Sequence, residues 1–395
     1  MERKKKAAAW LYGIGLCGVI ILNAVAWLRA DFCDWYVSHI FPIWLNTYAR
    51  LTSCVPFSAG EIMLILAVCI TVFGIGFFII NVILHNRFEK AMWRFTKVYS
   101  WLLLVVMYIM TLNCFILYHT TDFSHRYLAK ESEEDLVVDV SGIVPVETAA
   151  SAPKSNYTKK NIAILRDYLV EQCNTLAPKF ERDEAGNIIY DEEELMNLAV
   201  DAMQSLGEEY DQLSGYYVTP KYLTYSGFFS QQSIMGYYFP FSLEANINSI
   251  MYVTTVAPTV CHELSHTKGF LFEDDANMIA YLACTKSDNE FLQYCGYLSV
   301  LNYVNNDFYT SINKNKEKYK THVRISDLVA NDNVFLTKED WTEVEKKAVI
   351  KTETVKKVST ELMQTSMKMN GVEEGMQQYN EVVNLLLDYY EGTLF

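Results

Sequence analysis

The chain has 395 residues, of which 51% are hydrophobic, 14% are aromatic and 20% are charged. This apolar share excludes an intrinsically disordered protein, and the length allows two to three compact units. The formal net charge of −14 argues against a dedicated nucleic-acid-binding protein, because neutralising phosphates requires clustered lysine and arginine. We therefore expect no nucleic-acid partner.

The charge is distributed unevenly along the chain. Residues 1–118 contain ten Lys and Arg against five Asp and Glu, whereas residues 119–395 contain 23 against 42. A basic, apolar N-terminal third that precedes an acidic remainder is typical of a membrane anchor that carries a soluble domain.

Three segments of the N-terminal third are long and apolar enough to cross a lipid bilayer, which takes about 20 helical residues. They contain no charged side chain and cover residues 7–28, 62–84 and 98–118. Three charge-free runs of this length are not typical of buried core helices. The first has no small-residue cleavage site after it, so we interpret it as an anchor rather than a signal peptide. Residues 1–118 are thus predicted to be a three-helix membrane anchor whose partner is the lipid bilayer.

The basic residues predict the orientation of these spans. Residues 3–6 and 87–97 each carry four Lys or Arg, whereas the loop between the first two spans carries only Arg29 and Arg50, opposed by three acidic residues. The positive-inside rule then places the N-terminus in the cytoplasm. We expect a multi-pass protein of the cytoplasmic membrane with an extracytoplasmic C-terminal domain. Cys33 and Cys54 share the expected outer loop and could form a disulfide.

The remainder of the chain is expected to form a linker and an α+β domain in which helices dominate. Residues 119–158 indicate a linker or stalk, because they are first acidic and then rich in small residues and proline. Residues 159–395 are assigned to the domain. Residues 215–255 are rich in Tyr, Phe, Ser and Gly, which favours short strands and loops. Helical spacing of apolar residues is found in residues 160–173, 191–213, 257 onwards, 338–368 and 371–391.

One segment carries residues of metal chemistry. His262-Glu263-Leu264-Ser265-His266 is an HExxH motif, and on a helix its two imidazoles share a face and can bind one zinc ion. Glu263 is then placed to take a proton from a metal-bound water, while zinc polarises the scissile carbonyl. The alternative is an exposed helix with a solvated His pair. Apolar flanks (VAPTV and GFLF) favour a partly buried helix, in which such groups are costly unless they bind something.

A catalytic zinc ion needs a third protein ligand. The sequence does not match the pattern HExxHxxGxxH, in which a third His is the ligand, because Phe272 occupies the position of that His. The next candidates are Glu273, Asp274 and Asp275. Eleven residues after His262, Glu273 would lie about 16 Å along a straight helix, so the chain must turn back. Gly269 predicts this turn, since glycine tolerates the left-handed conformation that ends helices, and a new helix from about Glu273 would face the metal.

Residues 273–277 read Glu-Asp-Asp-Ala-Asn, an ExxAN sequence. With the HExxH motif it resembles the gluzincins, in which a separate helix bearing ExxA[DN] gives the third ligand. The chain is most similar to an uncharacterised family of bacterial multi-span membrane zincin-like proteins with the signature HELxHxxGxxxEDEAN, and more distantly to the ImmA/IrrE-type metallopeptidases.

The resemblance implies a zincin-like fold and a Zn²⁺ ion bound by His262, His266 and Glu273. It also implies Glu263 as the general base and Asn277 behind the ligands. Asp275 stands where the signature has Glu, so it is the alternative third ligand and otherwise a supporting residue behind the site.

Substrate contacts are suggested by the same resemblance. Residues 240–248 (PFSLEANIN) are similar to the strand that precedes the active helix, and gluzincins hold a peptide on an edge strand by backbone pairing. Glu244 and Asn246 are therefore candidate substrate-binding residues, and an ordinary core strand is an equal alternative. No single donor for an oxyanion stands out among four candidates, Tyr237, Tyr294, Tyr297 and His322.

These features predict a membrane-anchored zinc metallopeptidase, a hydrolase that cleaves peptide or protein substrates of the cell envelope outside the cytoplasmic membrane. The alternative is a catalytically silent zincin fold that acts as an envelope sensor or scaffold. Glu263 favours the enzyme, because a structural zinc site needs ligands but no adjacent base. An intramembrane protease is excluded, since no apolar run of 18 residues encloses the HExxH motif.

Overall fold

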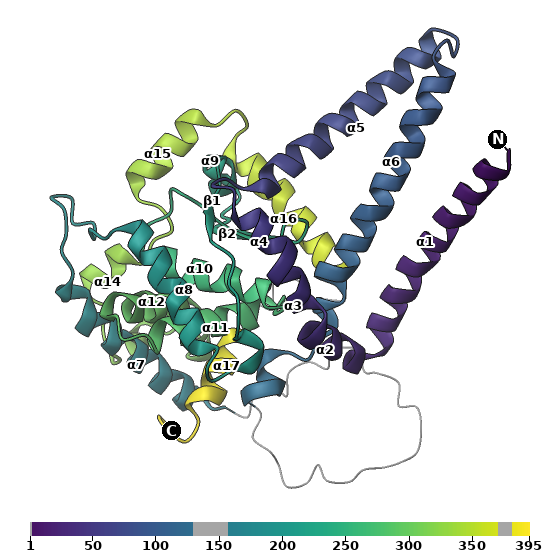
Figure 1. The fold of residues 1–395 in the computed structure, drawn as a ribbon. Helices are drawn as coiled ribbons and strands as arrows, with labels where there is room; N and C mark the ends of the chain where they lie inside the picture. Colours follow the sequence, from purple (N-terminus) through teal and green to yellow (C-terminus); the bar gives the residue numbers. More distant parts are fainter. Residues whose placement is uncertain (1, 129–156, 370–380) are drawn as a thin grey trace, which may run out of the picture. The chain divides into compact units, whose positions relative to one another are not determined.

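The computed structural model describes residues 2–128, 157–369 and 381–395 (Figure 1). Helices dominate it, with one small sheet of three strands, so the predicted helix-dominated α+β class is confirmed. The chain divides into a membrane unit, Met1–Thr120 with Phe239–Glu244, and a second unit, Thr121–Tyr238 with Ala245–Phe395. We call the second the outer unit because none of the candidate membrane spans of the described residues lies in it.

The membrane unit contains three helices that are long and apolar enough to cross a bilayer, as predicted. They are α1 (Glu2–Leu28), α5 (Ala59–Ile83) and α6 (Glu89–Met110). Helix α6 begins earlier than expected and continues through the π-helical turn η2 (Thr111–Phe115) into the 3₁₀ turn η3 (Leu117–His119). Side chains of α1 and α5 are mostly exposed, as expected of helices that lipid surrounds.

Polar and small residues join α1 to α6 inside the membrane unit. The hydroxyl of Tyr108 donates to the carbonyl of Gly15 over 2.9 Å, and the Asn23 amide donates to the Thr111 hydroxyl over 2.8 Å. A Cβ atom at Gly15 would lie 2.7 Å from the Leu104 side chain, so glycine allows this close approach. Interhelical hydrogen bonds of this kind satisfy polar groups that lipid cannot.

Short helices follow the first span, where the sequence suggested only a loop. They are α2 (Ala30–His39), α3 (Phe41–Trp44), η1 (Leu45–Ala49) and α4 (Arg50–Ser53). The possible disulfide between Cys33 and Cys54 is not formed, and both are free thiols. Cys33 is buried with its thiol directed at the carbonyl of Ala26, whereas Cys54 is exposed.

The segment Phe239–Glu244 is held within the membrane unit by hydrogen bonds. Tyr48 and Thr52 donate their hydroxyls to the carbonyls of Phe241 and Ser242, each over 2.8 Å. The Glu244 carboxylate accepts the first backbone N–H groups of α5, at 3.1 Å from Ala59 N and 2.8 Å from Gly60 N. A carboxylate at a helix N-terminus satisfies unpaired N–H groups and complements the helix dipole.

The outer unit is built on five long helices. They are α7 (Lys159–Leu176), α8 (Glu192–Leu206), α10 (Val253–Thr267), α11 (Glu273–Thr285) and α12 (Glu290–Ser311). Helix α10 packs against α8, α11 and α12, and α12 also packs against α7. The core between them contains fully buried apolar side chains, among them Leu165, Leu169, Leu195, Val260, Leu264 and Leu301. Burying each such side chain contributes about 1.5–3 kcal/mol relative to exposure.

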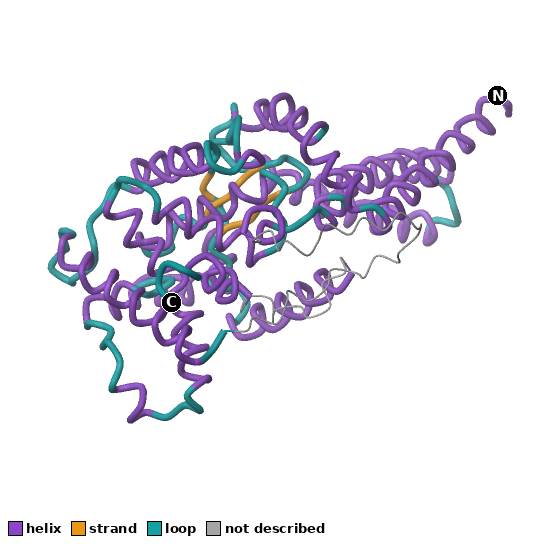
Figure 2. Tube along the Cα trace, turned by 90° about the horizontal axis from the view of Figure 1, so that it is seen from below, coloured by secondary structure: helices purple, strands orange, loops and turns teal. Residues whose placement is uncertain are grey.

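Residues 215–255 form the short strands and loops predicted for them, together with the short helix α9 (Ser226–Gln231). Figure 2 shows the strands among the helices. The strands β1 (Lys221–Tyr222), β2 (Gly236–Phe239) and β3 (Glu244–Ile247) pair in the order β1-β3-β2. Strand β3 is central in this order, with β1 and β2 at the two edges, and it runs parallel to β1.

The C-terminal part contains α13 (Lys316–Lys320), α14 (Asp327–Asp332), α15 (Lys338–Lys347), α16 (Thr352–Met369) and α17 (Glu381–Tyr390). The single helix predicted at 338–368 is interrupted where Ala348 is extended (ψ 122°), before the β-branched residues Val349 and Ile350. Residues 371–380 of the predicted last helix lie outside the described residues.

The predicted linker begins with residues that the structure describes and continues into residues that it does not. Its residues 129–156 lie outside the described residues, but residues 121–128 belong to the outer unit. There the ring of Phe123 contacts the rings of Tyr210 and Phe270, with centroids 5.1 and 5.8 Å apart. An aromatic contact between residues so distant in sequence leaves no local sequence signal.

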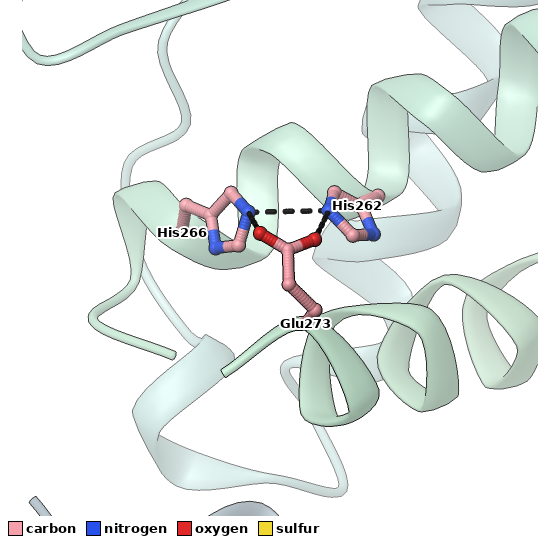
Figure 3. Close-up of side chains that lie close together, drawn as sticks. All are labelled: His262, His266 and Glu273. Atoms are coloured by element: carbon pink, nitrogen blue, oxygen red, sulfur yellow. Dashed lines mark hydrogen bonds and ion pairs between the residues drawn. The ribbon is translucent and has the colours of Figure 1, made fainter. Parts of the chain in front are cut away.

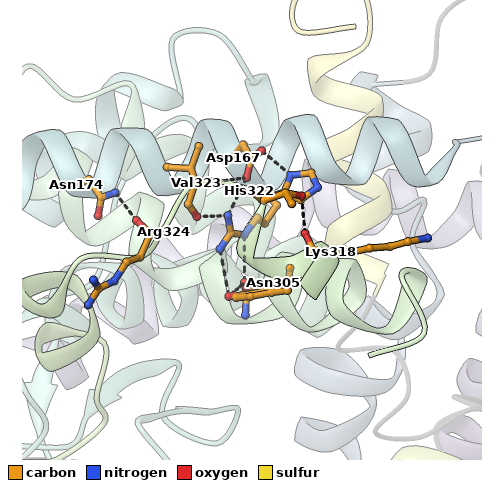
Figure 4. Close-up of polar contacts among 10 residues, drawn as sticks. Asp167, Asn174, Asn305, Lys318, His322, Val323 and Arg324 are labelled. Carbon is orange, nitrogen blue, oxygen red and sulfur yellow. Dashed lines mark hydrogen bonds and ion pairs between the residues drawn. The ribbon is translucent and has the colours of Figure 1, made fainter. Parts of the chain in front are cut away.

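A buried cation joins α7 to α12 and to the segment after α13 (Figure 4). The fully buried Arg166 donates to Asn305 over 3.2 Å, to Asp167 over 2.7 Å and to the backbone carbonyl of Val323. His322 binds the other oxygen of Asp167 through Nδ1 at 2.8 Å. The cluster satisfies its charged groups internally, as a buried guanidinium requires.

A second buried ion pair fixes the start of α10, the helix that carries the HExxH motif. Asp332 is completely buried and accepts two hydrogen bonds of 2.7 Å from Arg182 and one of 2.7 Å from the Tyr294 hydroxyl. Its backbone carbonyl accepts from the Thr254 hydroxyl, in the first turn of α10, over 2.9 Å.

We expect Asp332→Ala to lower the free energy of unfolding of the outer unit by about 3–5 kcal/mol, because it leaves the Arg182 guanidinium partly buried without its anion. Thermal unfolding of the full chain in detergent measures this loss. The matched control is Glu343→Ala, which removes a carboxylate from exposed pairs with Lys346 and Lys347 and should change little. Equal effects of the two substitutions would contradict the assigned role of Asp332.

Candidate metal centre

The backbone reverses direction between α10 and α11, as the sequence predicts. Helix α10 ends at Thr267, and Gly269 adopts a φ of +96°. Two hydrogen bonds close the helix end, from Gly269 N to the His266 carbonyl (3.0 Å) and from Phe270 N to the Ser265 carbonyl (3.3 Å). Only glycine adopts this left-handed conformation without strain. Helix α11 then begins at Glu273, which confirms the predicted turn and second helix.

The reversal brings three possible ligands together (Figure 3). The Nε2 atoms of His262 and His266 lie 3.1 Å apart, and the carboxylate of Glu273 lies 3.1 Å from the first and 3.9 Å from the second. One ligand atom from each residue falls within 4.8 Å of the others. Ligands at about 2.0–2.1 Å from a tetrahedral zinc ion are roughly 3.3 Å apart, so these three residues fit one ion.

Both imidazoles are oriented through their other ring nitrogen. Nδ1 of His262 lies 2.9 Å from the Asn277 side-chain oxygen, and Nδ1 of His266 lies 2.7 Å from the carbonyl of Phe270. These oxygens accept, so each Nδ1 carries the donated hydrogen and each Nε2 is directed to the shared centre. Asn277 therefore lies behind a ligand, where the resemblance placed it.

The three groups shift one another's protonation. Burial lowers the pKa of His262, but its hydrogen bond and charge interaction with Glu273 outweigh burial and raise that pKa to about 9. Burial and the neighbouring His262 lower the pKa of His266 to about 4. Burial raises the pKa of Glu273, but His262 and His266 together lower it to about 2. Near neutral pH the site holds one carboxylate, one neutral imidazole and one proton on His262, which a metal ion would displace.

Asp275, the alternative third ligand, lies elsewhere. Its side chain is only 2% exposed, and Oδ2 accepts the backbone N–H of Phe123 over 2.9 Å. Burial, followed by the charge of Asp274, raises the pKa of Asp275 well above its ordinary value. Among the described residues, Glu273 and not Asp275 forms the group with the two histidines.

Glu263 is buried beside this group. It is 4% exposed, and burial raises its pKa to about 8. The backbone N–H of Tyr238 in β2 donates to its carboxylate, whereas Oε2 has no hydrogen-bond partner within the described part of the chain. A buried carboxyl with an unsatisfied oxygen and a pKa near neutrality is typical of catalytic groups.

The candidate substrate residues Glu244 and Asn246 do not line an edge strand. Both belong to β3, which is central because it is paired to β1 and β2. Glu244 holds the start of α5, and the Asn246 amide donates to the Tyr237 carbonyl of β2 over 3.2 Å. The edge-strand interpretation is therefore wrong and the equal alternative, a core strand, holds, since β3 is the middle strand and its residues Asn246 and Ile247 are paired with β1.

Three of the four candidate oxyanion donors form side-chain hydrogen bonds elsewhere, and Tyr297 forms one with Tyr168. Tyr294 binds Asp332 and His322 binds Asp167 in the two buried clusters described above. A tyrosine that the sequence did not single out, Tyr303 of α12, lies close enough to Glu273 that burial, followed by the Glu273 charge, raises the pKa of Tyr303. No motif marks it among 27 tyrosines, so only the fold identifies it.

We expect the full chain to bind one zinc ion at this centre and to release a proton, chiefly from His262. Because a pKa near 9 keeps His262 protonated at neutral pH, zinc affinity should rise between pH 6 and 9. Calorimetry in buffers of different ionisation enthalpy measures both effects.

His266→Ala should weaken zinc binding by at least about 100-fold, whereas His125→Ala, which changes an exposed histidine, should not. Equal affinity of the two variants would refute the centre.

Comparison with known proteins assigns the chain to a protein family whose function is not known. The family described as "Protein of unknown function (DUF3810)" matches residues 36–387, which include α5, α6 and the metal centre. No curated protein and no solved structure matches the chain. Because the match covers most of its length, the chain belongs to the DUF3810 family.

Proposed function

We propose that this protein is a membrane-anchored zinc peptidase of the gluzincin type. The observation that carries the proposal is the convergence of His262, His266 and Glu273 beside the buried Glu263. Two neutral imidazole nitrogens and one carboxylate are a donor set typical of catalytic zinc, which keeps a fourth position for water or substrate. The HExxH helix, the glycine turn and the ExxAN helix support a zincin-like assignment of residues 159–395.

Bound at this centre, zinc would polarise the scissile carbonyl and acidify a water molecule. Glu263 supplies the proton chemistry. It accepts a proton from the attacking water and returns it to the leaving amine, and a pKa near 8 suits a group that must both take and give a proton close to neutral pH. Asn277 and the Phe270 carbonyl keep the two imidazoles in the orientation that directs Nε2 to the centre.

The alternative is a catalytically silent fold that acts as a sensor or scaffold. A binding-only site would need the three ligands and no more. The buried Oε2 of Glu263 has no partner among the described residues, and an unsatisfied buried carboxyl oxygen costs stability. Such a cost is typical of a group retained for chemistry, so this observation favours the enzyme.

We expect Glu263→Gln to preserve zinc binding and to lower kcat for peptide hydrolysis about 10²–10⁴-fold, because the amide cannot accept the proton of water. Zinc content and the cleavage of a mixed peptide library, read by mass spectrometry, measure the two properties. Glu290→Gln is the matched control, since Glu290 pairs with Lys179 at the surface. Hydrolysis by Glu263→Gln at the rate of the wild type would refute the assigned base.

We also infer that the outer unit lies outside the cytoplasmic membrane and acts on peptides or proteins of the cell envelope. Most basic residues of the membrane unit lie in residues 3–6 and in residues 87–97, which include the end of the α5–α6 turn and the start of α6. Figure 1 shows the N-terminus of α1 and the α5–α6 turn at the same end of the three-helix group. This placement agrees with both segments being cytoplasmic.

A reporter enzyme that is active only after export should be active when fused after Phe395 and inactive when fused after Arg87. The reason is that the two points lie on opposite sides of the membrane in the inferred topology. Activity only in the Arg87 fusion would reverse the orientation and place the metal centre in the cytoplasm.

A further inference from the structure

Strand β2 passes directly over the side chain of Glu263. A Cβ atom at Gly236 would lie 2.6 Å from both Cγ and Oε1 of Glu263, and 2.8 Å from the Thr259 methyl group. Non-bonded carbon atoms reach their optimal separation only at about 3.5–4.0 Å, so all three approaches are clashes. Any residue other than glycine at position 236 must therefore displace the Glu263 or Thr259 side chain.

The same strand also binds the Glu263 carboxylate. The backbone N–H of Tyr238 donates to it. Strand β2 thus provides one hydrogen-bond donor to Glu263 and, two residues earlier, the space left by a missing side chain. The carboxylate is confined between them and is almost fully buried.

The backbone of β2 is itself held in place. Asn248 donates its backbone N–H to the Met235 carbonyl over 2.7 Å and its side-chain amide to the Ile234 carbonyl over 2.9 Å. Asn246 donates to the Tyr237 carbonyl over 3.2 Å. Both asparagines are 1% exposed. Because these buried bonds resist a shift of the strand, a side chain added at position 236 would move the flexible Glu263 instead.

We propose that Gly236 is a positioning residue that determines where the Glu263 carboxylate lies and thereby the rate of proton transfer. The inference rests on the proposed function. Of the groups at the site, Gly236 acts on Glu263, since the three nearest atoms that a new Cβ would meet belong to Glu263 and Thr259 and not to His262, His266 or Glu273. The metal centre and the base are thus positioned by different elements, the first by the α10–α11 turn and the second by β2.

The test is Gly236→Ala in the full chain in detergent. We expect kcat for peptide hydrolysis to fall about 10–100-fold with KM nearly unchanged, because a misplacement of about 1 Å costs on the order of 10²-fold in rate. Zinc affinity should stay within about twofold, since the ligands are untouched. Gly227→Ala is the matched control, because a Cβ atom there has no neighbour within 4 Å, and it should keep the activity of the wild type.

Two further measurements separate positioning from a general structural effect. In a Glu263→Gln background, Gly236→Ala should change the residual rate less than about twofold, because residues that act as one unit are not additive. A structure of the Gly236→Ala variant should show Glu263 displaced and its contact with Tyr238 N lost. Unchanged kcat with Glu263 in place, or full additivity of the two substitutions, would overturn the inference. Lack of hydrolysis by the wild type would instead overturn the proposed function, and the position of Glu263 in the variant would still decide the role of Gly236.

Discussion

The reversal of the backbone between α10 and α11 is the constraint on which the metal centre depends. Without it, His262 and Glu273 would lie about 16 Å apart along one helix. Gly269, at a φ of +96°, follows the end of the first helix, and the second begins four residues later, at Glu273. The first carboxylate of α11 then meets two imidazoles from the last turns of α10. The packing of α8 and α12 around this pair of helices holds the reversal in place.

The centre is built from charged groups inside a helical core, and such groups cost stability unless they are paired. Glu273 is paired with His262, and Glu263 is nearly neutral near pH 7 because burial raises its pKa to about 8. Lys268 is another buried charged group whose cost is reduced in this way. Burial lowers its pKa to about 7, and its ammonium group donates to the carbonyls of Ser214 and Tyr216 over 2.7 and 2.9 Å. A bound metal ion would stabilise this arrangement by replacing a proton with stronger bonds.

Local signals in the sequence predicted the spans, the meeting of His262, His266 and an acidic residue of the following helix, and the turn between the two helices. Hydrophobic length identifies α1, α5 and α6, and the spacing of His262, His266, Gly269 and Glu273 follows from helix geometry. These features depend on residues close together in sequence, for which periodicity and glycine are informative.

Features that depend on distant contacts were not predicted. The resemblance suggested Glu244 as a substrate contact, with an ordinary core strand as the equal alternative, whereas its carboxylate holds the start of α5, 184 residues away. The position of Asp275 against Phe123 and the contact of Gly236 with Glu263 likewise arise from segments remote in sequence. The order of the strands determines which of them lies at the edge of the sheet. That order could not be predicted, because strands of two to four residues contain too little sequence pattern.

The most direct test of the account is X-ray absorption spectroscopy of the zinc-loaded full chain. We predict a first shell of two imidazole nitrogens and oxygen ligands at about 2.0–2.2 Å, with multiple scattering from two histidines that is reduced to that of one in His266→Ala. Sulfur ligands at about 2.3 Å would contradict the account, because they would place the metal at free cysteines of the outer unit, such as Cys261 and Cys284, rather than at His262, His266 and Glu273.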